Sequence, residues 1–356
     1  MIEYLPWSKQ TLKEVFSYYT TGFRILDIQL GGGCNFSCIY CDTPERTTKS
    51  KVSIKWLEKT VKENPISWIY ICGLGEPTFG QNIIQLKAIL KICKQYKIKC
   101  SMFTNYSLID DEIKSYIKDS VLYILFKFDT KSESLAKELF GSKNLDCYFD
   151  NISTITELVQ VSENCTNIAA SIVPTQKNKE ELLRITDFCI NNNIFPLIGD
   201  LEDSGKSIDN YKALKINDEE LSIIKTEIEK KLQIKYQIPI CPSVIGGIHI
   251  DYNNNVIVDG FTGLSCHWFW LKEPNIKVLV NDVEKYQFEE IVKSIKAYRN
   301  SRIDNIKQYI EHLNDMPFGG CGGDVKSMLT EYLKLYIADL SHVFRPAIEG
   351  GYTSRG

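Results

Sequence analysis

Three cysteines stand within eight residues of one another, in the segment GGGCNFSCIYC at residues 31–41. Cysteine thiolates are the usual ligands of iron–sulfur clusters, and a four-iron cubane normally takes four of them. A loop that offers only Cys34, Cys38 and Cys41 leaves one iron open to a chelating small molecule. Such an arrangement suits catalysis better than simple electron transfer.

Two other interpretations of the three thiols are open. A structural zinc site would need a fourth ligand nearby, typically in a second Cys-x2-Cys pair, and the sequence has no such pair. Buried thiols also pack as small apolar side chains. Three of them directly after a triple glycine are unusually dense for packing alone, so the pattern favours a cluster.

The spacing Cys34-x3-Cys38-x2-Cys41, with the aromatic Tyr40 before the last cysteine, resembles the motif of the radical S-adenosylmethionine (radical SAM) enzymes. The resemblance implies that the cysteines hold a [4Fe–4S] cluster and that SAM chelates the fourth iron. It also implies that one-electron reduction, from a flavodoxin- or ferredoxin-type donor, cleaves SAM to a 5′-deoxyadenosyl radical. The protein then supplies binding and orientation.

Length and composition exclude several other classes of protein. A chain of 356 residues predicts one large domain and a smaller one. Its twelve cysteines would suit a disulfide scaffold only in a small secreted chain, and the first residues lack the features of a signal peptide, so we expect reduced thiols and a cytoplasmic location. No apolar run is long enough to span a bilayer. A net charge of −3 gives no argument for binding nucleic acid.

The elements that must position the cysteine loop alternate along the chain. We expect strands at 24–30, 67–71, 98–103, 121–128, 168–173 and 194–198. We expect helices at 53–62, 81–96, 110–118, 132–140, 151–163, 179–191 and 218–232, and a surface connection at 203–215. This alternation predicts an α/β protein with a parallel sheet covered by helices. The resemblance implies a partial (β/α)6 TIM-like barrel, whose active residues lie at the carboxyl ends of the strands.

The ends of the second and third strands carry candidate SAM-binding residues. The segment CGLGEP at 72–77 resembles the glycine–glycine–glutamate–proline segment with which the family contacts the amino group of SAM, although Leu74 interrupts the glycine pair. Gly73 and Gly75 let the backbone approach a ligand, and Glu76, followed by Pro77, can accept from an ammonium group. An ordinary turn is the alternative.

Asn105 follows the third strand, where relatives often place a polar side chain on SAM. Lys127 and Asp129 end the fourth strand among apolar residues. Alternate residues of a strand face the same way, so both side chains are expected at the mouth of the barrel, and we count both as candidate catalytic residues. Buried charges are costly unless they are paired. Two alternatives are therefore equal. The two side chains form a mutual ion pair, or they bind a ligand, which is either the SAM carboxylate, through Lys127, or the substrate.

The alternation of strands and helices ends after the helix expected at 218–232. Two alternating runs about an asparagine triplet, at 247–260, predict a β-hairpin. Cys241 precedes this hairpin, Cys266 follows it, and Cys321 lies in a glycine-rich segment. The region resembles the SPASM and shorter twitch extensions of radical SAM enzymes, which implies that the three thiols hold one auxiliary [4Fe–4S] cluster.

The fourth ligand of this auxiliary cluster is open between His267, Asp324 and the substrate. The alternative is three unrelated thiols in a small helical cap. These interpretations divide the chain into a lead-in helix at 1–23, a barrel at 24–215, a small C-terminal α+β auxiliary-cluster domain at 216–345 and a disordered tail at 346–356.

The resemblance implies an oxidoreductase or peptide maturase that abstracts a hydrogen atom and completes an oxidation, cross-link or epimerisation. Because most relatives with such extensions modify ribosomally made peptides, a peptide is the expected substrate. A small polar metabolite, such as an aminosugar or a cofactor precursor, is the alternative substrate. A non-catalytic metal-binding scaffold is the alternative of another class.

Overall fold

The structure is a computed structural model that describes residues 2–8, 14, 22–41, 48–142, 145–199, 201, 205–232, 247–260 and 276–302. Its centre is a nine-stranded sheet with the order β12-β11-β10-β2-β3-β4-β5-β8-β9. Six neighbouring strands run parallel and follow the chain order. They are β2 (Ile25–Gly33), β3 (Trp68–Gly75), β4 (Lys99–Thr104), β5 (Leu122–Lys127), β8 (Ile168–Ile172) and β9 (Phe195–Ile198).

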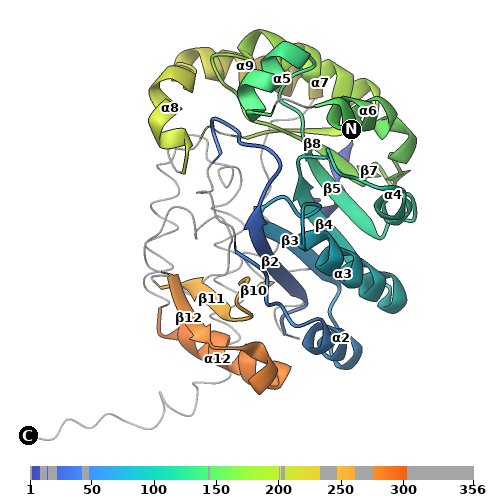
Figure 1. Cartoon of the computed structure of the whole chain (residues 1–356), viewed down its shortest axis with the longest axis vertical. Coiled ribbons are helices and arrows are strands. Elements are labelled where there is room, and N and C mark those ends of the chain that lie inside the picture. Colours follow the sequence, from blue (N-terminus) through green and yellow to red (C-terminus); the bar gives the residue numbers. More distant parts are fainter. Residues whose placement is uncertain are drawn as a thin grey trace, which may run out of the picture.

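Helices lie along the outside of this curved sheet (Figure 1). They are α2 (Ile54–Glu63), α3 (Asn82–Tyr96), α4 (Asp111–Lys118), α5 (Glu133–Phe140), α6 (Asp146–Thr154), α7 (Leu182–Asn191), α8 (Ser207–Leu214) and α9 (Asp218–Leu232). Capping fixes several helix starts: the Ser53 hydroxyl accepts from the Trp56 N–H at 3.2 Å, and the Asp110 carboxylate from the Ile113 N–H at 3.0 Å. The predicted α/β fold with a parallel sheet is confirmed.

Alternation along β2 divides its side chains between two environments. Leu26, Ile28 and Leu30 are fully buried and belong to the main hydrophobic core. Asp27 and Gln29, which alternate with them, are buried on the opposite face of the strand. The strand thus combines an apolar face with a polar one.

The predicted hairpin is confirmed, and it continues the sheet. Strands β10 (Gly247–Ile250) and β11 (Val256–Asp259) are antiparallel, and β12 (Ile276–Val280) pairs with β11. Strand β10 runs parallel to β2, with His249 opposite Asp27 and Nδ1 3.1 Å from Oδ2. The short η5 (Val283–Lys285) and helix α12 (Phe288–Asn300) follow. This part of the chain is therefore joined directly to the strand that leads into the cysteine loop.

Three local predictions were wrong. Helix α8 replaces the surface connection expected within 203–215. The helix expected at 151–163 begins earlier, as α6, continues as η3 (Ile155–Leu158) and gives way to β6 (Val161–Ser162) and β7 (Cys165–Thr166). Glu163 and Asn164, which turn the chain between β6 and β7, have φ of 51° and 65°, incompatible with a continuing helix.

The third wrong prediction concerns the start of the chain. Residues 2–8, expected within a helix, form β1 (Glu3–Tyr4) and η1 (Leu5–Trp7). Strand β1 pairs with β7, which gives the backbone of Glu3 and Tyr4 partners outside any helix. No helix among the described residues is long and apolar enough to cross a membrane.

Candidate functional site

The cysteine loop begins where β2 ends, at the carboxyl edge of the parallel sheet. The triple glycine forms the last part of β2. A Cβ on Gly31 would lie 2.3 Å from the Thr48 carbonyl oxygen, and one on Gly75 would lie 2.1 Å from the Gly33 carbonyl oxygen, so neither position has room for a side chain. Glycine at position 75 lets the ends of β2 and β3 approach each other.

Helix α5 holds the other side of the loop. The N–H groups of Ser37 and Ile39 donate to the carbonyls of Phe140 and Leu139, at 2.8 and 3.0 Å. These carbonyls belong to the last turn of the helix, where the helix itself offers no donors. Gly141 closes the turn with φ of 59°, and a Cβ there would lie 2.4 Å from the Ser37 carbonyl oxygen. The loop therefore has a fixed path.

The three thiols of the loop are reduced; Cys34 is exposed, while Cys38 and Cys41 are half-buried. Although Cys34 is exposed as a whole residue, partial desolvation of its thiol raises its pKa to about 11. Burial raises the pKa of Cys38 to about 12, and the negative charge of Cys41 adds to both shifts. Neighbouring thiolates that repel one another are stabilised by a bound metal centre, which deprotonates a coordinating thiol outright.

The thiols do not converge on one point. Among the described residues, no group of three His, Cys, Asp or Glu side chains is arranged around a single ion. Each cysteine of an iron–sulfur cubane binds a different iron, so the thiols of a cluster loop need not meet at one point.

Glu76 follows β3 and is 3% exposed. Its Oε1 accepts from the Thr78 N–H and hydroxyl, at 3.1 and 2.7 Å, and from the Thr104 hydroxyl at 2.6 Å; its Oε2 accepts from the Asn105 N–H at 2.6 Å. All these donors are neutral, and no ion pair of Glu76 occurs within the described part of the chain. Burial raises its pKa, although the hydrogen bonds oppose the shift. The site therefore suits a cationic ligand.

Asn105 connects this carboxylate with the cysteine loop. While its backbone N–H bonds Glu76, its side-chain amide donates to Asn35 Oδ1 at 2.8 Å and lies 3.6 Å from Cys34 Sγ. The Ser107 hydroxyl completes the cluster, donating to Asn105 Oδ1 at 2.7 Å and lying 2.7 Å from Asn35 Nδ2. The contact of Asn105 with SAM stays a prediction. The position of Asn105 beside Cys34 is compatible with such a contact.

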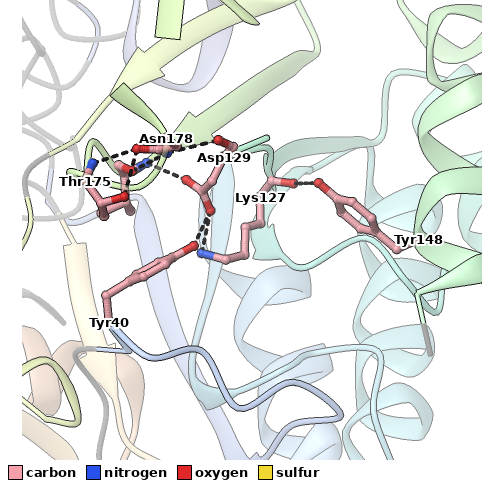
Figure 2. A network of polar contacts seen from close by, with 7 residues as sticks. Tyr40, Lys127, Asp129, Tyr148, Thr175 and Asn178 are labelled. Atoms are coloured by element: carbon pink, nitrogen blue, oxygen red, sulfur yellow. Dashed lines mark hydrogen bonds and ion pairs between the residues drawn. The ribbon is translucent and has the colours of Figure 1, made fainter. Parts of the chain in front are cut away.

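Lys127 and Asp129 form the ion pair that was one of the two interpretations, with Nζ 2.9 Å from Oδ2. The Tyr40 hydroxyl donates to the same carboxylate oxygen (Figure 2). The Lys127 ammonium also lies 4.2 Å from the centre of the Tyr40 ring. The structure thus brings Lys127, the last residue of β5, and Asp129, just after it, into contact with Tyr40 of the loop. All three were predicted as site residues.

The remaining candidates are placed only in part. Gly73 pairs with Leu30 through the backbone of β3, and Pro77 is buried. The predicted auxiliary-cluster residues lie outside the described residues: Cys241, Cys266, Cys321, His267 and Asp324.

The structure also describes cysteines outside the loop. Cys93, Cys100 and Cys189 are buried and therefore pack in the interior. Cys165 is half-buried, and Cys147 is exposed.

Sequence reasoning missed the partners that orient the candidate residues. Thr78, Thr104 and Ser107 could have been found, because they are polar residues within two positions of Glu76 or Asn105 in the sequence. Tyr148 and Asn178 could not, since no pattern in their surroundings indicates which strand end they approach.

The comparisons with known proteins agree with this geometry. Residues 28–189 match the family model described as the radical SAM superfamily. Streptococcus suis SuiB bound to precursor peptide SuiA is similar in structure, with a TM-score of 0.55 and 16% identity over 79% of this chain and 67% of that one. Native anSMEcpe with bound AdoMet and Cp18Cys peptide has a TM-score of 0.55 and 14% identity, over 91% of this chain and 99% of that one.

SuiB has also been solved bound to S-adenosylmethionine, with a TM-score of 0.56 and 16% identity over 79% of this chain and 69% of that one. At these identities the likeness is one of fold. No curated protein matched the chain in sequence.

Proposed function

Because residues 28–189 match the radical SAM superfamily model, we propose that the chain belongs to this superfamily and is an enzyme that cleaves S-adenosylmethionine reductively and removes a hydrogen atom from its substrate. The observation that carries the proposal is the position of Cys34, Cys38 and Cys41 just after β2, at the carboxyl edge of the sheet, beside the buried Glu76, which has no cationic partner among the described residues. When bound, a [4Fe–4S] cluster with SAM on its open iron supplies the one-electron chemistry that yields a 5′-deoxyadenosyl radical.

The residues of this chain have separate tasks in that chemistry. The three thiolates hold the cluster, and the Phe36 N–H, 3.3 Å from Cys34 Sγ, together with the Asn105 amide orients the first of them. The Glu76 carboxylate binds the ammonium group of SAM, because a buried carboxylate without a cation gains most from a charged donor. The close packing at Gly75 keeps this carboxylate at the end of β3, beside the loop.

We propose a ribosomally made peptide as the substrate. Support comes from SuiB and anSMEcpe, which share the fold and whose structures contain a precursor peptide and the Cp18Cys peptide. Oxidation, cross-linking and epimerisation are the candidate outcomes, completed by an auxiliary [4Fe–4S] cluster on Cys241, Cys266 and Cys321. A small polar metabolite is the second candidate substrate.

Anaerobic reconstitution tests the proposal. The parent protein is expected to bind iron and sulfide and to form 5′-deoxyadenosine from SAM when a strong reductant is added. A variant with Cys34, Cys38 and Cys41 changed to alanine should lose this activity and remain folded. Cys147→Ser, at an exposed cysteine outside the site, is the matched control and should behave as the parent.

Two results would overturn parts of this proposal. Unchanged 5′-deoxyadenosine formation in the triple variant would remove these cysteines from the site. Iron binding without SAM cleavage in the parent would leave the metal-binding scaffold as the function. Mass spectrometry of candidate peptides and metabolites after turnover then decides the substrate: loss of two hydrogens indicates oxidation or a cross-link, and deuterium incorporated from solvent indicates epimerisation.

A further inference from the structure

The Lys127–Asp129 pair lies next to the cysteine loop and contacts it through one side chain. Tyr40 stands between the ligands Cys38 and Cys41 in the sequence and is buried. Its hydroxyl donates to Asp129, and its ring lies against the Lys127 ammonium. Both members of the pair therefore hold Tyr40, and through it the second half of the loop.

Asp129 is fixed on every side that the structure describes. Its Oδ2 accepts from the Tyr40 hydroxyl and pairs with the Lys127 ammonium. Its Oδ1 accepts from the Val173 N–H at 2.6 Å, and its backbone carbonyl accepts from the Asn178 amide at 2.9 Å. Figure 2 shows Asn178 on the side of Asp129 away from Tyr40. The side chain is 0% exposed. A carboxylate used in this way has little capacity left for a ligand.

Lys127 is held almost as firmly. Its ammonium lies 5.3 Å from the centre of the Phe140 ring, and its carbonyl accepts from the Tyr148 hydroxyl at 3.0 Å. Its side chain is 18% exposed, so little water screens its charge. That charge lies directly against the loop, because the ammonium is 4.2 Å from the centre of the Tyr40 ring.

We propose that Lys127 and Asp129 are positioning residues whose opposite charges set the reduction potential of the cluster on the neighbouring loop, an inference that rests on the proposed function. Reduction adds one negative charge to the cluster. A nearby buried cation stabilises the reduced form and a nearby anion stabilises the oxidised form, because charges in a poorly screened site act over several ångströms.

The test is a potentiometric titration of the reconstituted full-length protein, following the EPR signal that disappears when Cys34, Cys38 and Cys41 are changed to alanine. Lys127→Met should shift the reduction equilibrium toward the oxidised form on the order of tenfold, which is 59 mV for a one-electron couple. Asp129→Asn should shift it the opposite way. The double variant, which removes one charge of each sign, should return toward the parent.

Two further variants separate charge from structure. Lys127→Arg keeps the charge and should keep the parent potential. Lys99→Met removes a charge that lies against Trp68 and Tyr123 at the other end of the strands, and should not move the potential. Structural damage would shift Lys127→Met and Asp129→Asn in the same direction or reduce the iron content of both.

Each outcome decides the inference. Opposite shifts with full iron content support it, while equal potentials or shifts of one sign in a parent that cleaves SAM overturn it and leave the proposed function intact. If Lys127→Met takes up no iron, the potential of Asp129→Asn decides alone, and a value equal to the parent overturns the inference. A parent that forms no cluster overturns the proposed function and this inference with it.

Discussion

Replacing Glu76 by glutamine removes one negative charge from a buried site and keeps the shape of the side chain. In the parent this carboxylate accepts four hydrogen bonds from neutral donors and has no cation among the described residues. The hydrogen bonds hold the side chain in place but do not neutralise it. A bound ammonium group would therefore contribute the charge-assisted interaction that the protein itself does not supply.

A hydrogen bond to a charged group contributes about 1.5–3 kcal/mol. Its loss corresponds to a decrease in SAM affinity of about tenfold to a hundredfold. Glutamine can keep its carbonyl toward the three donors at Oε1, but its amide then faces the Asn105 N–H, donor against donor. The affinity loss should thus appear without loss of the fold, because the burial of a charge is removed at the same time.

The pH dependence of SAM affinity provides a second test of the same carboxylate. Burial raises the pKa of Glu76 above its ordinary value of 4.5. The carboxylate that binds the ammonium is therefore present above the raised pKa and is lost as the pH falls through it. SAM affinity of the parent should fall toward that of Glu76→Gln in this interval, while the affinity of the variant stays level.

The assay is calorimetric titration of reconstituted protein with SAM in the absence of reductant, together with thermal unfolding of each variant. Glu181→Gln is the matched control, because Glu181 also accepts from a threonine hydroxyl and a backbone N–H, those of Thr130 and Lys131, at 2.7 and 3.1 Å. Its Kd should equal that of the parent. A Kd for Glu76→Gln within about twofold of the parent would refute the assignment of this carboxylate to SAM.

Two further predictions concern the loop and the C-terminal thiols. Gly75→Ala should lower the free energy of unfolding by about 1–3 kcal/mol and reduce iron uptake, because its Cβ would meet the Gly33 carbonyl. Chemical denaturation and iron analysis measure the two effects. Gly199→Ala is the control and should change neither quantity, because its Cβ has only an ordinary contact at 3.7 Å. Changing Cys241, Cys266 and Cys321 to alanine should leave about four of eight irons, keep SAM cleavage and abolish the finished product. Iron analysis and mass spectrometry measure these results. A variant that loses no iron would contradict the auxiliary cluster.

The sequence alone predicts the parallel sheet and the place of the loop, because both depend on local patterns. The apolar runs that end before Gly31 and at Ile71 give strands, and the caps Ser53 and Asp110 give helix starts. Alternation and the cost of burying charge gave the Lys127–Asp129 ion pair as one of two equal alternatives, and the structure shows this pair.

Contacts between distant segments could not be predicted in this way. Helix α8 was expected as a surface connection because its segment is polar. Contacts with the cysteine loop help to stabilise this helix. The Asn210 amide donates to the Ile39 carbonyl at 2.9 Å, and the N–H of Lys206, just before the helix, donates to the Cys41 carbonyl at 2.9 Å. The Tyr40–Asp129 bond likewise spans a separation that no local pattern reveals.

We propose that Cys34, Cys38 and Cys41 leave one iron of a cluster open and that SAM binds there. Electron–nuclear double resonance of the reduced cluster, with SAM labelled at its amino nitrogen and carboxylate, measures this contact directly. We expect a strong coupling to both labels in the parent and a weakened nitrogen coupling in Glu76→Gln. A cluster that forms on these cysteines but shows no coupling to either label would contradict this proposal.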